Sequence, residues 1–343
     1  MMKRAGTIAL AVLLLGGLVA STPGLTEEKM AITPGLISCE SYSLRELFGP
    51  DKMTLRTFPA FVKGLGITGV VLNDFFFESW DASYLDELKK VVSDAGCVLT
   101  AVIIEGNLAT ADEAARRKQI DEDIIKLRAA AYLGVPVVRI NIGGTGDATQ
   151  DGTVGVERVI AAFNEMLPLA KELGVKITIE NHGGVSAKAD YILRVIKGTD
   201  PKWVGSCLDF GNWPDEVRYE ECRKLAPYVY HTHAKAHRFD DAGEAEYDFG
   251  RILAMLRYAG FKGTLSIEWE GAGDPVVGVE KSRDLLLKYW PPPGSPSLPL
   301  DRLIAQGAAV EKAATGFQFT EGPAWDGERY LYFSDIPGNT VYR

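Results

Sequence analysis

The chain has 343 residues, of which 46% are hydrophobic and 24% are charged, as is ordinary for a soluble globular protein. This length suits either one large domain with a smaller remnant or two ordinary domains. The formal net charge of −9 disfavours nucleic acid as a partner, because phosphate binding needs a basic surface.

The first 28 residues have the features of a signal peptide followed by a short linker. Lys3 and Arg4 precede the apolar run 7–20, which is long enough for a signal-peptide core and too short for a membrane-spanning helix. Small side chains at 19–21 suit cleavage near position 21. We therefore expect an exported protein, periplasmic or extracellular, with no stable membrane span after cleavage. An uncleaved anchor is the alternative.

Export would permit disulfides, so the cysteines bear on the fold. The chain has four of them, at Cys39, Cys97, Cys207 and Cys222. Three lie in or beside predicted strands, where a buried free thiol is the common case. Their spacing matches no metal-binding knuckle. We expect these cysteines to be mostly reduced and buried.

Strand and helix patterns alternate from residue 36 to about residue 290. Eight apolar, β-branched runs predict strands. They cover residues 36–40, 69–73, 98–104, 136–141, 176–180, 204–209, 228–233 and 264–268. Helical patterns lie between them and end at glycines, the residue expected just past a helix C-terminus. These patterns cover 82–95, 111–133, 155–173, 186–197 and 248–259, and a last helix ends near Trp290.

Eight strands alternating with helices over about 250 residues predict a (β/α)8 TIM barrel, which we assign to residues 29–290. An open doubly wound sheet is the alternative, and it would need a glycine-rich phosphate turn after the first strand. The segment that follows 36–40 has no such turn, and the GGTG at 143–146 follows the fourth strand instead. The pattern therefore favours the barrel.

The end of the chain has a different composition. Residues 291–299 read PPPGSPSLP, a stiff and polar sequence typical of a linker. In residues 300–343, aromatic-rich strand patterns are broken by DG and PGN turns. These turns predict a β-hairpin-like unit that is not a continuation of the barrel.

Four segments in the second half of the predicted barrel each end in a residue that can hold a divalent metal. The candidate ligands are Glu180, Asp209, His233 and Glu268, separated by 29, 24 and 35 residues. Each interval is about one βα unit, and a closed parallel barrel brings the ends of its strands to one common rim. A single carboxylate at a strand end is usually a cap or an ion-pair partner. Four such positions on successive strands favour a shared metal site.

Three carboxylates and one imidazole make a site that donates mainly oxygen. Such a site suits one divalent metal ion, with Mn²⁺ favoured and Mg²⁺, Co²⁺ or Zn²⁺ as alternatives. A structural zinc site would use Cys and His ligands instead, and the cysteine spacing offers no such set.

All four histidines of the chain lie in the same half of the predicted barrel, at or just past strand ends. They are His182, His231, His233 and His237. His231 and His233 share one face of a strand, because side chains alternate between faces. We favour His233 as the ligand. His231 would then either hold a substrate hydroxyl or serve as a hydrogen-bonded core residue.

Further residues near the strand ends are candidates for binding substrate. We assign this role to His182, Asn212, His231, Lys235, His237 and Arg139. Lys235 would point the same way as His233 if the strand continues, and would either neutralise an enediolate or pair with a carboxylate. Arg139 would either fix the substrate or form an internal ion pair, and we favour the ion pair.

The segments TIENHGG, CLDFGN, HTHAKAH and SIEWEG resemble the xylose isomerase-like barrel superfamily, in its sugar phosphate isomerase/epimerase branch. The resemblance covers roughly residues 33–290. It implies a (β/α)8 barrel with one divalent metal held by Glu180, Asp209, His233 and Glu268. It also implies that Glu180 and Glu268 form the catalytic pair that moves protons.

The resemblance implies a metal-dependent sugar isomerase or epimerase acting on a small carbohydrate. Proton transfer next to a carbonyl would pass through a metal-stabilised enediolate. Some epimerases of the family carry His three residues after the Asp, where this chain has Asn212. The chain also has no evident phosphate cradle, so the word phosphate is not carried over.

Other functions remain open on the sequence alone. The same metal and base would serve a lyase acting on 3-keto-glycosides, and a non-catalytic sugar-binding barrel is a further alternative. DNA-repair endonucleases share this barrel but use three zinc ions and more histidines, so four histidines and a net charge of −9 disfavour them. The identity of the sugar, the choice between isomerase and epimerase, and assembly into a homo-oligomer are left open.

The segment FTEGPAWDGERYLYFSDIPGNTVYR resembles the opening of a gluconolactonase-type six-bladed β-propeller. The Glu of the EGP motif binds the catalytic metal in that family, which here implies Glu321. Residues 300–343 would form an incomplete first blade, so we expect no lactonase activity from them.

Overall fold

The computed structural model describes residues 33–49 and 51–291, residue 316, and four short segments of the tail. These segments are 320–325, 331–335, 337–338 and 340–342. The predicted targeting segment 1–28 lies outside the described residues, as does nearly all of the predicted linker 291–299.

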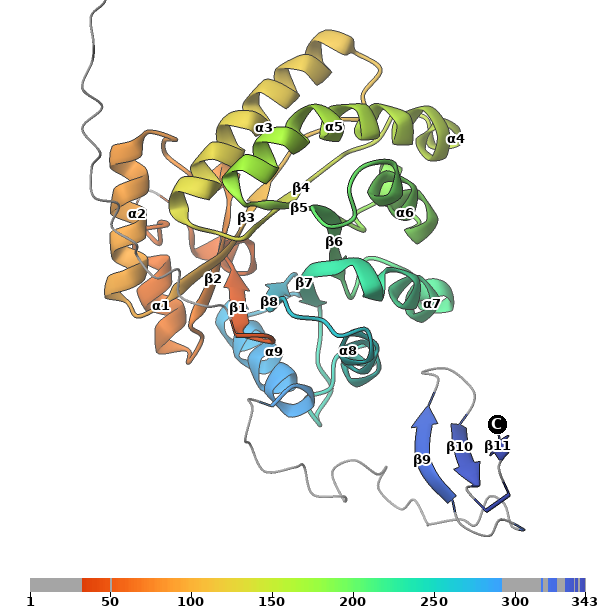
Figure 1. Cartoon of the computed structure of the whole chain (residues 1–343). Coiled ribbons are helices and arrows are strands. Elements are labelled where there is room, and N and C mark those ends of the chain that lie inside the picture. Colours follow the sequence, from red (N-terminus) through yellow and green to blue (C-terminus); the bar gives the residue numbers. More distant parts are fainter. Residues whose placement is uncertain are drawn as a thin grey trace, which may run out of the picture. The chain divides into compact units, whose positions relative to one another are not determined.

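Eight parallel strands form a closed barrel in chain order, with β8 returning to pair with β1 (Figure 1). The strands are β1 Ile37–Glu40, β2 Gly69–Asn73, β3 Val98–Ile104, β4 Val137–Ile140, β5 Lys176–Glu180, β6 Val204–Asp209, β7 Val229–Ala236 and β8 Thr264–Trp269. The predicted (β/α)8 barrel is therefore confirmed. The clearest difference is β7, which continues three residues past the predicted end at His233.

Helices follow the strands and surround the barrel (Figure 1). They are α1 Phe58–Gly64, α2 Ala82–Asp94, α3 Glu113–Leu133, α4 Ala148–Gln150, α5 Val156–Leu173, α6 Ala189–Gly198, α7 Asp215–Leu225, α8 Phe249–Tyr258 and α9 Pro275–Tyr289. Gly134 ends α3 with a φ of 84°, in the left-handed region that glycine tolerates best, and its N–H bonds the carbonyls of Ala130 and Ala131.

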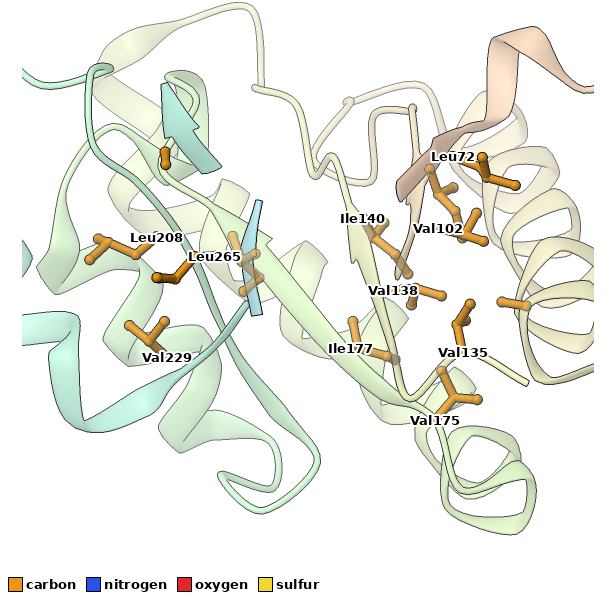
Figure 2. Close-up of a cluster of buried hydrophobic side chains, with 14 of the residues drawn as sticks. Leu72, Val102, Val135, Val138, Ile140, Val175, Ile177, Leu208, Val229 and Leu265 are labelled. Atoms are coloured by element: carbon orange, nitrogen blue, oxygen red, sulfur yellow. The ribbon is translucent and has the colours of Figure 1, made fainter. Parts of the chain in front are cut away.

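The main apolar core lies between the strands and the surrounding helices. Figure 2 shows part of it, with the labelled residues Leu72, Val102, Val135, Val138, Ile140, Val175, Ile177, Leu208, Val229 and Leu265. A second, smaller cluster consists of Val71, Ala101, Ile103 and Val137, on β2, β3 and β4. Alternation along each strand places this second cluster inside the barrel.

The inward-facing positions of β5 to β8 are polar instead of apolar. They include Thr178, Cys207, His231, Thr264 and Ser266, all at most 3% exposed. The interior of the barrel is thus apolar on the β2–β4 side and polar on the β5–β8 side. The polar side is the one that carries the candidate metal ligands.

The described part of the tail forms an antiparallel sheet of its own, with strand order β11-β10-β9. Its strands are β9 Thr320–Trp325, β10 Leu331–Asp335 and β11 Thr340–Tyr342. The strand patterns predicted there are confirmed, with three strands in place of a single hairpin. The likeness to a gluconolactonase-type blade stays a prediction.

All four cysteines are buried and free, as expected from the sequence. Burial raises the pKa of the Cys207 thiol to about 12, so this group stays protonated at neutral pH. Among the residues that the structure describes, no helix is both long and apolar enough to cross a membrane.

Candidate metal centre

Four ligand-type side chains converge at the carboxyl ends of the last four strands. Glu180 and Asp209 end β5 and β6, Glu268 is the next-to-last residue of β8, and His233 lies within β7. Each offers one ligand atom, and these four atoms all lie within 4.8 Å of one another. Every one of the four residues is at most 5% exposed.

The register of the strands explains why these side chains meet. Asp209 of β6 lies beside His233 of β7, and Lys235 of β7 lies beside Glu268 of β8. Because side chains alternate between the two faces of a strand, His233 and Lys235 both point to the inner face of the barrel. The direction predicted for Lys235 is therefore confirmed.

The donor atoms suit a divalent cation. Asp209 Oδ2, Glu268 Oε2 and both ring nitrogens of His233 are buried and make no hydrogen bond among the described residues. Buried polar atoms that lack hydrogen bonds are costly, and three neighbouring carboxylates also repel one another. A divalent ion would offset both costs, and three oxygen donors with one nitrogen match the ligands that Mn²⁺ and Mg²⁺ accept.

Lys235 brings a positive charge into the same cluster. Its Nζ lies 3.3 Å from Asp209 Oδ2, 3.3 Å from Glu268 Oε2 and 3.1 Å from Glu270 Oε1. The side chain is only 2% exposed. Burial raises the pKa of Glu268, but the charges of Lys235 and His233 outweigh burial and hold that pKa at about 2.

Arg139 of β4 pairs with Glu180, as Lys235 pairs with Glu268. Its guanidinium forms ion pairs with Glu180 and with Glu105, and its side chain is 3% exposed. Burial raises the pKa of Glu180, yet the charges of Arg139 and His233 hold it well below its ordinary value. Arg139 therefore occupies the internal ion pair that the sequence analysis favoured.

A cavity of about 250 Å³ adjoins these groups. Its lining residues are Glu40, Tyr42, Asn73, Phe75, Ile103, Glu105, Arg139, Glu180, His182, His233, Glu268 and Glu270. Three of the four candidate ligands thus face the cavity, and Asp209 is the one that does not line it. A small polar molecule in the cavity would touch both Glu180 and Glu268.

Comparison with protein families agrees with this geometry. The model of the family described as "Xylose isomerase-like TIM barrel" matches residues 59–289, which is more than half of the chain. This chain belongs to the xylose isomerase-like TIM barrel family. The superfamily proposed from the four segments is therefore confirmed.

Two curated proteins resemble parts of this xylose isomerase-like chain. An uncharacterised protein of Methanocaldococcus jannaschii is 27% identical over 143 residues, covering 38% of this chain and 47% of that protein. The C-glycoside deglycosidase alpha subunit of Arthrobacter globiformis is 31% identical over 102 residues, covering 27% of each. The chain thus spans less than half the length of either of these relatives.

Solved structures share the barrel of this family at low sequence identity. L-Ribulose 3-epimerase has a TM-score of 0.62 at 18% identity, with 74% of this chain and 93% of that chain covered. The 3-keto-D-glucoside 4-epimerase of E. coli has a TM-score of 0.59 at 16% identity, covering 74% and 98%. A xylose isomerase-like barrel from Mycobacterium smegmatis, solved in complex with magnesium, has a TM-score of 0.56 at 17% identity, covering 74% and 95%.

The remaining histidines of this xylose isomerase-like barrel fall in three different places. His182 lines the cavity. His237 lies outside the cavity lining, and its Nδ1 is 2.7 Å from Glu246 Oε1. His231 lies next to His233 with the two rings 5.6 Å apart, and its Nδ1 is 2.9 Å from Thr264 Oγ1.

His231 is fully buried and does not line the cavity. Burial lowers its pKa to about 3, so the ring is neutral. This position fits the hydrogen-bonded core role rather than contact with a substrate hydroxyl. Cys207 joins His231 and His233 in a second group of ligand-type atoms within 4.8 Å of one another.

Asn212 forms hydrogen bonds with three charged residues of the cluster. Its side-chain amide donates to Glu180 Oε1 at 3.1 Å, and its Oδ1 accepts from Lys235 Nζ at 3.0 Å. Its backbone N–H also bonds Asp209 Oδ1 at 2.7 Å. Asn212 does not line the cavity, so its geometry fits the positioning of Glu180 and Lys235 better than direct substrate contact.

Glu40 is a site residue that the sequence analysis missed. It ends β1, is 1% exposed, and places Oε2 3.3 Å from His233 Nε2. Asn73 of β2 donates to its other oxygen at 2.8 Å. Burial raises the pKa of Glu40 to about 8, so this carboxyl is largely protonated at neutral pH. The sequence contains the signal that could have identified it, a carboxylate at a strand end. Glu40 ends the first predicted strand as Glu180 ends the fifth.

Proposed function

We propose that this protein is a divalent-metal-dependent isomerase or epimerase that acts on a small carbohydrate. The observation that carries the proposal is the convergence of Glu180, Asp209, His233 and Glu268 beside a cavity of about 250 Å³. The sugar epimerases among the solved structures with this barrel support a substrate of that class.

Glu180 and Glu268 are the proposed proton-transfer pair. Both line the cavity and both have pKa values below neutrality, so each is ionised and able to accept a proton from carbon. If the other glutamate then takes up a proton from water and returns it to the opposite face of the same carbon, that carbon is inverted. Return to the neighbouring carbon exchanges an aldose and a ketose. The bound divalent ion would act as a Lewis acid toward the charge that develops on the carbonyl oxygen.

Other residues of the chain would bind the sugar and keep Glu180 and Glu268 ionised. Lys235 and Arg139 keep Glu268 and Glu180 ionised by charge. Glu105 and His182 line the cavity and present polar groups to sugar hydroxyls. The proposed metal is Mn²⁺, in keeping with a donor set dominated by oxygen.

A lyase acting on 3-keto-glycosides is the second candidate. The named activities of the Arthrobacter globiformis relative and of the E. coli epimerase favour it, because both concern glycosides. One glutamate would remove the proton next to the keto group, and the bond from the sugar to the aglycone would break. The aglycone would leave with the bonding electrons and take up a proton.

The test is hydrogen exchange at carbon. The purified full chain is incubated in D₂O with a panel of sugars and 3-keto-glucosides, after EDTA treatment and after addition of Mn²⁺. We expect metal-dependent deuterium incorporation next to the carbonyl in the wild type, and at least a 100-fold loss in Glu180→Gln and Glu268→Gln. Glu220→Gln, an exposed substitution on α7, is the matched control.

The products separate the two candidates. Isomerisation leaves the mass of the sugar unchanged apart from deuterium, whereas elimination releases the aglycone. Absence of exchange with every carbonyl sugar, in the presence of Mn²⁺, would overturn both and leave a non-catalytic sugar-binding barrel.

We infer export from the sequence of the first 21 residues, and fractionation of the producing cells tests it. We also retain the proposal that residues 300–343 begin a gluconolactonase-type blade. The antiparallel order of β9, β10 and β11 supports that proposal. Sedimentation velocity of the full chain tests for assembly into a homo-oligomer.

A further inference from the structure

Two aromatic side chains line the part of the cavity contributed by the first two strands. Tyr42 follows β1 in a 3₁₀ turn (Ser41–Leu47), and Phe75 lies just after the end of β2. Their ring centroids are 5.9 Å apart with an interplanar angle of 83°, an edge-to-face pair. Phe75 is 51% exposed, so this part of the cavity opens to solvent.

Both rings are held in place by the groups behind them. The Arg45 guanidinium lies 4.5 Å from the centroid of the Tyr42 ring, and Arg45 itself donates to the carbonyl of Trp269 at 3.0 Å. Phe75 packs on Phe76 with the ring centroids 4.5 Å apart. These contacts restrict the two rings, and such restriction lowers the ordering cost of binding.

The size of the cavity limits what it can enclose. Its volume of about 250 Å³ is below the range of roughly 300–1,000 Å³ that is usual for pockets enclosing whole drug-sized ligands. A single sugar ring next to Glu180 and Glu268 would fill most of it. Any substituent on that sugar would extend to the open side, where Tyr42 and Phe75 lie.

An exposed phenylalanine is unremarkable when it stands alone on a surface. Phe75 differs because it lines the cavity that holds the proposed catalytic pair and because a second aromatic ring, Tyr42, stands against it. An apolar surface at the opening of a polar cavity is suited to a ligand that is polar at one end and apolar at the other.

We propose that Tyr42 and Phe75 form a subsite for the aromatic aglycone of a glycoside whose sugar ring occupies the cavity. The substrate is then an aryl glycoside bearing a keto group on the sugar, and not a free monosaccharide. This inference rests on the proposed function for the sugar-binding part of the cavity, and it adds the chemical class of the substituent.

The test compares two ligands that differ only in the aglycone. Phenyl and methyl 3-keto-β-D-glucopyranosides are titrated calorimetrically into the full chain in the presence of Mn²⁺. We expect the wild type to bind the phenyl compound about tenfold more tightly than the methyl compound. Phe75→Ala and Tyr42→Ala each bring this ratio close to one, and Phe75→Tyr preserves it. Tyr258→Ala, which removes a surface ring that is 86% exposed on α8, leaves the ratio unchanged.

The outcomes separate this inference from the proposed function. A phenyl preference that depends on Phe75, in a protein that exchanges no deuterium, would support the subsite and overturn the catalytic proposal. Equal affinities for the two glycosides, binding of neither, or a ratio unaffected by both alanine variants would overturn the subsite. Conversion of a dimer to a monomer by Phe75→Ala, with the ratio unchanged, would assign the aromatic pair to a second copy of the chain and also overturn it.

Discussion

Replacing Arg139 with methionine tests whether the buried carboxylates need compensating charge. The Arg139 and Glu180 side chains are 3% and 2% exposed, so the variant leaves Glu180 buried without its principal cation. Breaking a buried pair in this way costs about 3–5 kcal/mol of unfolding free energy. Methionine has similar length and no charge, so most of the packing is retained.

The assay is urea unfolding of the wild type and Arg139→Met at pH 7, each with EDTA and with Mn²⁺. We expect the large loss in EDTA and a smaller loss with Mn²⁺, because an ion held by Glu180 would supply the missing positive charge. Arg117→Met is the matched control. Arg117 pairs with Asp121 and Glu165 but is 43% exposed, and surface ion pairs contribute little. A loss in Arg139→Met no larger than in the control, or one unaffected by Mn²⁺, would refute the reasoning.

The difference in unfolding free energy between the wild type and Arg139→Met should depend on pH in a definite direction. Although burial raises the pKa of Glu180, Arg139 and His233 hold it well below the ordinary value of 4.5. A group with a depressed folded-state pKa stabilises the fold above its unfolded-state pKa and loses that contribution as the pH falls through the folded-state value. The difference between the wild type and Arg139→Met should therefore be full above about pH 5 and narrow in more acidic solution.

Three further predictions concern the metal and the catalytic pair. Asp209→Asn should weaken Mn²⁺ binding at least tenfold in calorimetric titration without changing the far-ultraviolet circular dichroism, and an unchanged affinity would remove Asp209 from the ligand set. Mn²⁺ at about 100 times its dissociation constant should stabilise the wild type by roughly 2.7 kcal/mol in urea unfolding, and no shift would contradict a folded-state site. The exchange rate should show no loss from protonation of Glu268 between pH 5 and 8, because the pKa of Glu268 is about 2. A group that titrates between pH 5 and 8 in the wild type and is absent from the pH profile of Glu268→Gln would contradict this value.

The fold was largely predictable because most of its helices and strands carry local signals. The bounds of β2, β3, β5 and β6 agree with the predicted ranges, and a glycine followed by an apolar residue marks where β2, β3 and β5 begin. Helix α7 was missed because its sequence is strongly charged, and it buries only Arg218, Cys222 and Leu225. Such a helix has too short an apolar stripe to be recognised by periodicity.

The extent of β7 could not be predicted for a related reason. Its inward-facing residues include His231, His233 and Lys235, so the run looks like a strand followed by a polar loop. Only the closed barrel shows that this side of the interior is polar, with Lys235 1% exposed among the carboxylates. Lysine is almost never fully buried unless it is paired, and the partners come from other strands.

The convergence of Glu180, Asp209, His233 and Glu268 was predictable, because spacing of about one βα unit brings successive strand ends to one rim of a barrel. Their role as metal ligands stays a prediction. Glu40 was missed because the candidates were sought on the last four strands, while the barrel closes by pairing β8 with β1. This closure brings Glu40 to within 3.3 Å of His233, across more than half of the chain. The aromatic pair of Tyr42 and Phe75 follows the neighbouring strands β1 and β2 and carries no comparable periodic signal.

The proposed metal site is tested most directly by locating the bound ion in a crystal. Crystals of the full chain soaked in Mn²⁺ would be measured at the manganese absorption edge. We predict one anomalous peak per chain, ligated by Glu180, Asp209, His233 and Glu268. A peak at any other group of residues, such as Cys207 with His231, would contradict a metal site at these four residues. The absence of a peak at a concentration that saturates binding in solution would contradict it as well.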